Sequence, residues 1–324
     1  MLRKMMSVML SCMLLLMVTG AVAEESVGGR GMQQGGGMRA GGGAVDKSGD
    51  AELQTMIAEV VPQFELLSFT DDESGITLQY YLYTPTAAAE NYPLVMFIPD
   101  SSVVGQAASA VLTQGWGGLV FATEESQATN PCYVLVPVFT DTVVDDSFST
   151  SPQIDVAVKI ITSLCESEPI DTNRLYTTGQ SMGGMTSFHL NLTYPDLFAA
   201  SIFVGSQWNV AIMSPLESSK FFYIVSAGDP KASAGQAELM ALFDADAAAY
   251  AKAEWSAQDS EEVQSQAVEA LLEQGCDANF VTFALGSTTA DGQASTGGAG
   301  EHMTSFDYAY KLDAVRAWLF AQSK

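Results

Sequence analysis

Short, unbroken runs of hydrophobic or β-favouring residues recur along this chain and alternate with longer segments in which hydrophobic residues repeat with a helical period. Runs of the first kind are typical of strands buried on both faces, and segments of the second kind are typical of helices that pack on a sheet. The alternation predicts an α/β fold with a doubly wound, mostly parallel sheet. The predicted strands cover residues 94–98, 133–136, 174–178, 199–204, 221–226 and 280–285, and the predicted helices cover 51–60, 153–165, 182–194, 236–250, 261–274 and 305–322.

Two more strands are predicted before these, at the N-terminal side of the domain. Residues 64–69 and 76–83 flank the turn-rich sequence TDDESG and therefore predict an antiparallel hairpin at one edge of the sheet. Farther along, residues 231–279 are long for one crossover between parallel strands. We expect that segment to carry extra helices over the functional site.

The first 50 residues have a different composition from the rest of the chain. Basic Arg3 and Lys4, an apolar core at 5–18 and the Ala-Val-Ala sequence of residues 21–23 form the pattern of a cleaved signal peptide. Residues 24–50 are rich in glycine and predict a flexible linker. The sequence thus predicts an exported protein, secreted or held at the cell surface, with one folded domain over residues 51–324.

Charge argues against some classes of binding partner, and the cysteines limit the possible disulfides and metal sites. The chain has 38 acidic and 13 basic residues, a formal net charge of −25, which argues against binding to nucleic acid or to an anionic membrane. Beyond the predicted signal peptide the cysteines are Cys132, Cys165 and Cys276, an odd number from which one disulfide could form. No C-x-x-C pattern occurs, so no metal site is predicted.

The sequence Gly179-Gln180-Ser181-Met182-Gly183 carries the candidate chemistry. It follows a predicted strand and precedes a predicted helix, and G-x-S-x-G in that setting predicts a sharp turn that exposes a nucleophilic serine. The glycines lack Cβ atoms that would crowd the turn, and the N–H of Met182 would point to a developing oxyanion. A glycine-rich turn with an ordinary serine is the simpler interpretation.

A serine hydroxyl needs a base, and the base needs a carboxylate to orient it. The chain has two histidines, and His189 lies two helical turns beyond Ser181, about 12 Å along the axis, too far to act on it. His302 is the candidate base, in a predicted glycine-rich loop between the last strand and the terminal helix. Asp229 is the candidate orienting acid, because it is the acidic residue directly after the strand at 221–226.

The second oxyanion donor is expected from the loop after the strand at 94–98. The sequence there is Pro99-Asp100-Ser101-Ser102, and we predict the backbone N–H of Ser101 as the donor, with Ser102 as the alternative. A carboxylate on Asp100 would oppose a nearby anion unless its side chain points elsewhere.

These residues carry a family resemblance. Residues 170–205 resemble the esterase branch of the α/β-hydrolases, which includes polyhydroxybutyrate depolymerases and feruloyl and acetylxylan esterases. Such relatives usually have His-Gly where this chain has Pro99-Asp100. The resemblance covers residues 64–324 and implies a catalytic domain that needs no cofactor, with Trp208 at the substrate. We predict Gln180, next to the candidate nucleophile, as a second substrate-binding residue, and we place the start of the catalytic domain at residue 51. The matching positions are Asp171, Arg174, Tyr176, Gly179, Ser181, Met182, Gly183, Gly184 and residues 194–200.

The sequence therefore predicts an exported serine hydrolase that cleaves carboxylic esters through an acyl-enzyme. Ser181 would be the nucleophile, His302 the base and Asp229 the acid. The predicted substrate is a small-molecule or polysaccharide-linked acyl ester, for instance of a hydroxycinnamic acid. Two alternatives stay open: a serine peptidase that acts on short peptides, and a catalytically weak binding protein tethered by the glycine-rich segment.

Overall fold

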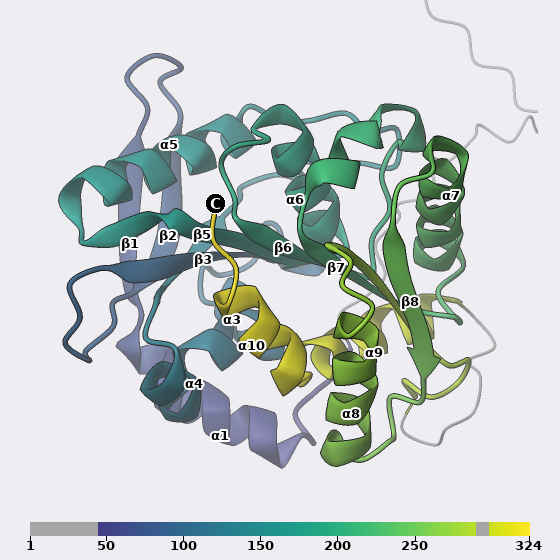
Figure 1. Ribbon diagram of the computed structural model, residues 1–324. Coiled ribbons are helices and arrows are strands. Elements are labelled where there is room, and N and C mark those ends of the chain that lie inside the picture. Colours follow the sequence, from purple (N-terminus) through teal and green to yellow (C-terminus); the bar gives the residue numbers. More distant parts are fainter. Residues whose placement is uncertain (1–44, 290–297) are drawn as a thin grey trace, which may run out of the picture. The chain divides into compact units, whose positions relative to one another are not determined.

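The computed structural model describes residues 45–289 and 298–324, which contain a nine-stranded sheet (Figure 1). The order of strands across the sheet is β1-β2-β4-β3-β5-β6-β7-β9-β8. The pairs β1–β2 and β2–β4 are antiparallel, and every other pair is parallel. The strands are β1 (Glu65–Thr70), β2 (Thr77–Tyr83), β3 (Tyr92–Ile98), β4 (Tyr133–Val138), β5 (Ile170–Gln180), β6 (Ala200–Val204), β7 (Phe221–Ser226), β8 (Tyr250–Trp255) and β9 (Ala278–Phe283).

Helices cover both faces of this sheet. In Figure 1, α5, α6 and α7 lie above the sheet, and α1, α3, α4, α8 and α10 lie below it. The predicted doubly wound, mostly parallel sheet with an antiparallel N-terminal edge is therefore confirmed. The helices are α1 (Ala51–Val60), α2 (Ala110–Thr113), α3 (Trp116–Leu119), α4 (Glu124–Thr129), α5 (Gln153–Ser167), α6 (Met182–Thr193), α7 (Pro230–Asp246), α8 (Glu261–Leu272), α9 (Gly298–Tyr310) and α10 (Asp313–Phe320).

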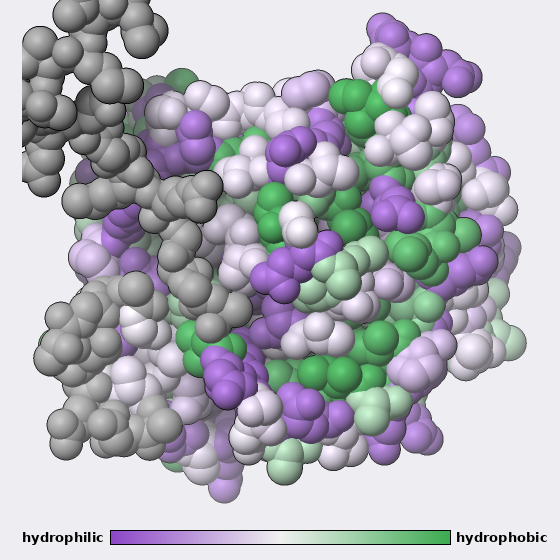
Figure 2. All heavy atoms as spheres, turned by 180° about the vertical axis from the view of Figure 1, so that it is seen from behind, coloured by the Kyte–Doolittle hydropathy of each residue, from purple (hydrophilic) through white to green (hydrophobic). Residues whose placement is uncertain are grey.

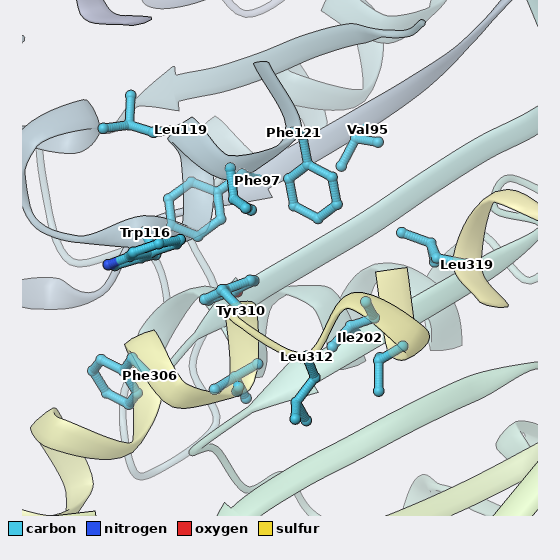
Figure 3. Close-up of a cluster of buried hydrophobic side chains, with 14 of the residues drawn as sticks. Val95, Phe97, Trp116, Leu119, Phe121, Ile202, Phe306, Tyr310, Leu312 and Leu319 are labelled. Carbon is cyan, nitrogen blue, oxygen red and sulfur yellow. The ribbon is translucent and has the colours of Figure 1, made fainter. Parts of the chain in front are cut away.

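Each face of the sheet has its own hydrophobic core because successive side chains of a strand point to opposite faces. Strand β3 illustrates this: Val95 and Phe97 belong to one cluster, while Leu94 and Met96 belong to the other. Figure 3 shows the first cluster, in which Phe97 meets Tyr310 of α9 edge to face, with ring centroids 5.6 Å apart. The central strands are thus buried on both sides, as their continuous hydrophobicity predicts.

The segment at 231–279 differs from the expectation of extra helices over the site. It contains α7, then strand β8 at the edge of the sheet, then α8. The helix predicted at 236–250 ends at Asp246, because Ala247 adopts a left-handed conformation (φ 55°) and Tyr250 already belongs to β8. The segment therefore widens the sheet rather than covering the site.

The C-terminal region also differs from its prediction. Helix α9 begins at Gly298, earlier than the helix expected at 305–322, and a break at residues 311–312 separates it from α10. None of the helices in the described ranges has both the length and the apolar character needed to cross a membrane. The predicted signal peptide at 1–23 and residues 24–44 of the predicted linker lie outside the described residues.

Candidate functional site

The turn between β5 and α6 holds Ser181 in a strained backbone conformation. Its φ is 52° and its ψ is −117°, a combination that residues with a side chain rarely adopt. The N–H of Ser181 donates to the carbonyl of Val204 on β6 at 3.0 Å, which anchors the turn to the neighbouring strand. Strain of this kind persists where the surroundings impose it, and it is common at functional sites.

Two glycines make this turn possible. A Cβ on Gly183 would overlap the carbonyl oxygen of Ile98 in β3, and a Cβ on Gly179 would overlap the backbone of Gly183. Helix α6 can therefore start close above β5 and β3 only because these positions lack side chains. The G-x-S-x-G spacing is thus explained by backbone packing at the turn.

Three predicted residues meet at this turn. Nε2 of His302 lies 2.9 Å from Oγ of Ser181, and Nδ1 of His302 is hydrogen-bonded to Oδ2 of Asp229. The imidazole also meets the ring of Phe306 edge to face, with centroids 5.0 Å apart. A hydroxyl, an imidazole and a carboxylate in this order can move a proton from the hydroxyl to the imidazole.

The placement of His302 corrects one expectation. The sequence places it in a loop, whereas it lies in the first turns of α9. Its side chain is 24% exposed, so the imidazole is partly accessible from outside while its far nitrogen contacts a buried acid. A helix fixes the ring more firmly than a glycine-rich loop would.

Asp229 follows β7 and caps α7, and only 2% of its surface is exposed. Its Oδ1 accepts the backbone N–H groups of Lys231 and Ala232, each at 3.2 Å, while its Oδ2 contacts His302. The two oxygens therefore have separate tasks: one fixes the carboxylate on the helix, and the other is directed at the imidazole.

Glu301, for which the sequence gives no prediction, is also buried beside this group. Its Oε2 accepts from the hydroxyl of Ser226 at 2.8 Å and from the N–H of Gly286 at 3.1 Å. A Cβ on Gly228 would overlap its carboxyl group. Glu301 thus joins the start of α9 to the ends of β7 and β9. The sequence indicates a role for Glu301 only through its position directly before His302.

The predicted oxyanion donors lie at the starts of two helical turns. Ser101 begins the short 3-10 helix η2 (Ser101–Val103), and Met182 begins α6. Asp100 is buried, and its Oδ1 accepts the N–H of Ser102 at 2.8 Å. Within the described ranges the N–H groups of Ser101 and Met182 donate to no protein acceptor. The amide of Ser102 is already engaged, which favours Ser101 over the alternative.

The two predicted substrate residues are both buried. Gln180 is 1% exposed, and its Nε2 donates to Oδ2 of Asp100 at 2.7 Å. Trp208 is 4% exposed, and its ring packs between Phe148, at 5.3 Å between centroids, and His189, at 5.8 Å. Both side chains therefore contact protein, which favours positioning for Gln180 and packing for Trp208 over direct contact with a substrate.

His189 lies within α6, two turns beyond Ser181, as the sequence predicts. Burial lowers the pKa of its imidazole, and the ring also contacts the hydroxyl of Thr193 at 3.4 Å. The thiols of Cys132, Cys165 and Cys276 are free, so the one disulfide that the sequence allows is not formed. Burial raises the pKa of the Cys132 thiol to about 12. The described residues contain no group of three or more His, Cys, Asp or Glu side chains suited to a metal ion.

Comparisons with known proteins agree on the fold. No protein-family model matches the chain, and no curated protein sequence matches it. It is similar to the solved structure of a thermostable esterase, with a TM-score of 0.65, 23% identity and coverage of 82% of this chain. The chain covers 64% of that protein, which is less than two thirds of its length. It is also similar to a ferulic acid esterase, with a TM-score of 0.50, 9% identity and coverage of 78% of this chain and 99% of the other.

The sheet order, the strained serine between β5 and α6 and these structural similarities lead to one conclusion. The acid after β7 and the histidine after β9 follow the serine in the chain order of one large group of folds. The chain therefore has the α/β-hydrolase fold.

Proposed function

We propose that this protein is a serine hydrolase that cleaves carboxylic esters through an acyl-enzyme intermediate. The observation that carries the proposal is the continuous hydrogen-bonded series from Ser181 through His302 to Asp229, with the serine on a strained turn. A serine with a purely structural role would need neither the strained turn, nor the hydrogen bond to His302, nor the carboxylate that orients this histidine. Similarity in fold to a thermostable esterase supports the same reaction class.

In the proposed reaction the hydroxyl of Ser181 attacks the ester carbonyl and gives its proton to Nε2 of His302. Nδ1–H of His302 donates to Asp229, which fixes the tautomer and stabilises the imidazolium that forms. The negative charge on the carbonyl oxygen would be met by the N–H groups of Met182 and Ser101. His302 then protonates the leaving alcohol. Water, deprotonated by the same imidazole, releases the acid and restores the serine.

We favour an ester over a peptide as the substrate. The peptidase alternative predicts a covering domain or lid over the site, whereas residues 231–279, the longest candidate segment, add strand β8 to the edge of the sheet. We also propose that residues 1–23 direct export and that the natural substrate is a small or polysaccharide-linked acyl ester. The sequence resemblance to feruloyl and acetylxylan esterases supports that substrate class.

A fluorophosphonate probe tests the proposal, because it reacts covalently with activated serines. Wild-type protein should be labelled, and Ser181→Ala should lose both labelling and at least about 10³-fold of its ester hydrolysis. Ser167→Ala, at an exposed serine of α5, is the matched control and should keep both. Folded wild-type protein that resists the probe would instead support a binding function.

A panel of substrates then separates the two hydrolase alternatives. We expect turnover of nitrophenyl acetate and of methyl esters of hydroxycinnamic acids, and little turnover of peptidyl anilides. Preferential cleavage of the anilides would replace the esterase proposal with the peptidase alternative.

A further inference from the structure

A buried hydrogen bond joins the two loops that would supply the oxyanion donors. Nε2 of Gln180 donates to Oδ2 of Asp100 at 2.7 Å, and the two residues are 1% and 3% exposed. Gln180 directly precedes Ser181, whereas Asp100 directly precedes Ser101. The bond therefore connects the nucleophile turn to the start of η2, across the boundary between β5 and β3.

The second oxygen of Asp100 shapes the η2 turn. Oδ1 accepts the N–H of Ser102 at 2.8 Å, which makes Asp100 the N-cap of this short helix. The cap engages the amide of Ser102 and leaves that of Ser101 without an acceptor among the described residues. One carboxylate thus fixes the turn and, through Gln180, fixes its distance from Ser181.

Gln114 determines which way the amide of Gln180 faces. Its Oε1 accepts from Nε2 of Gln180 at 3.2 Å and from the N–H of Asp100 at 3.4 Å. Both neighbours of Nε2 are therefore acceptors, while Oε1 of Gln180 is buried without a partner. Reversing the amide would place its oxygen against a carboxylate oxygen, so only the observed orientation is chemically consistent.

The hydrogen bond between Asp100 and Gln180 also affects the electrostatics of the oxyanion site. A carboxylate one residue from an oxyanion donor raises the energy of the developing negative charge unless donors engage it. Asp100 has two donors, the N–H of Ser102 and Nε2 of Gln180, on its two different oxygens. Charge-assisted hydrogen bonds of this kind hold the negative charge within the pair.

We propose that Asp100 and Gln180 are positioning residues that set the geometry of the oxyanion site. Asp100 belongs to the Pro99-Asp100 pair, which stands where the resembling esterases usually have His-Gly. The inference rests on the proposed hydrolase function. It predicts that breaking the pair lowers kcat, because the donors act in the transition state, and leaves KM nearly unchanged.

Exchanging the partners tests the pair. Gln180→Glu sets one carboxylate against another and should lower kcat about 10²-fold, the usual cost of a lost oxyanion donor. Adding Asp100→Asn removes this repulsion, since Nδ2 of the new side chain can donate to the new carboxylate while Oδ1 still caps Ser102. Oε1 of Gln114 still faces the new carboxylate, so the expected recovery is partial. The double variant should recover kcat to within about 10-fold of wild type, as a double-mutant cycle detects. If Gln180→Glu does not fold, Asp100→Asn alone should show the loss and the double variant the recovery.

Two further readouts separate positioning from simple stability. Affinity for a boronic acid that mimics the tetrahedral intermediate should fall with kcat, while affinity for the product acid should change less than about threefold. Gln79→Glu, the same substitution at an exposed site on β2, is the matched control and should leave both affinities unchanged.

The outcomes distinguish this proposal from the function on which it rests. Wild-type kcat in both single variants, or a loss of kcat that the double variant does not recover, overturns the positioning role even when wild type turns over esters. Wild-type protein that is neither labelled at Ser181 nor able to hydrolyse esters overturns the hydrolase function itself.

Discussion

Ser181 adopts a conformation that costs free energy, of the order of 1–3 kcal/mol for a residue with a side chain. The cost is met by contacts that leave the turn no alternative: the hydrogen bond to Val204 and the close approach of Gly183 to Ile98. Alanine at Gly183 would separate α6 from β3. The glycines of the motif are therefore requirements of packing, and the position of the serine hydroxyl is their consequence.

Contact among Ser181, Asp229 and His302 could be predicted from the sequence for a simple reason. The chain has two histidines, and helix geometry excludes His189. Glu301 could not be predicted in the same way, because its partners Ser226 and Gly286 come from distant strand ends. Nor does the sequence indicate that Gln180 turns inward to Asp100.

Glu301 provides a residue-scale prediction. Glu301→Ala leaves the hydroxyl of Ser226 and the N–H of Gly286 buried without this acceptor, and should cost about 2 kcal/mol or more of unfolding free energy. Because Glu301 adjoins His302, kcat should also fall, by about 10-fold. Denaturant unfolding and ester hydrolysis measure the two effects. Glu301→Gln retains an acceptor oxygen and should lose less of both. Unchanged stability in the alanine variant would contradict this account.

At the scale of elements, the boundary between α7 and β8 is hard to predict from the sequence. Strand β8 reads YAKAEW, in which only Ala251 and Trp255 are buried, and an alanine-rich stretch precedes it. Such an edge strand lacks the continuous hydrophobicity that identified the central strands. Ala247 ends α7 in a left-handed conformation without the usual glycine, so the sequence carries no signal that this helix ends there.

Helix α9 shows tertiary packing overriding local preference. It begins in the glycine-rich sequence that predicted a loop, yet Phe306 and Tyr310 are buried in the core on its inner face. Packing of that face stabilises a helix that its first residues disfavour. This matters for function, because α9 carries His302.

The link between the β1–β2 hairpin and α5 gives an element-scale prediction. Nζ of Lys159 contacts Asp71 at 2.8 Å, and this hydrogen bond holds the pKa of the Asp71 carboxyl well below its usual range. A lowered pKa in the folded state means that the carboxylate stabilises the fold above its unfolded pKa of about 3.9 and loses that contribution as pH falls. Asp71→Asn should therefore lower Tm at pH 7, and the difference from wild type should shrink below about pH 4.

Thermal unfolding from pH 3 to pH 7 measures this difference. Glu73→Gln is the matched control, since Glu73 contacts the same lysine at 2.9 Å but its side chain is 86% exposed. An exposed ion-pair partner contributes little to stability, so the Tm of the Glu73→Gln variant should stay near that of wild type. A difference between Asp71→Asn and wild type that is independent of pH would rule out the ion pair as its cause.

At the scale of the whole molecule, the excess of acidic residues dominates. The chain carries a formal net charge of −25, and ion pairs such as Lys47–Asp307 and Lys231–Asp146 engage some of its 13 basic residues. Figure 2 shows hydrophilic and hydrophobic residues interspersed over the back of the molecule. A large net negative charge favours solubility, but the negative charges repel one another in the compact folded state and so lower its stability.

This self-repulsion should make the fold more stable at higher ionic strength. Salt shortens the screening length from about 20–30 Å near 0.01–0.02 M to about 4–5 Å at 0.5 M, which weakens long-range repulsion more than it weakens contacts between adjacent charges. Raising NaCl from about 20 to 500 mM should therefore raise Tm by about 2 °C or more, equivalent to about 1 kcal/mol. KCl should act equally, because screening does not depend on the monovalent cation. Changing the exposed Glu59 and Glu65 to glutamine removes two negative charges and should reduce the rise. A fall in Tm with salt would instead mean that the ion pairs outweigh the repulsion.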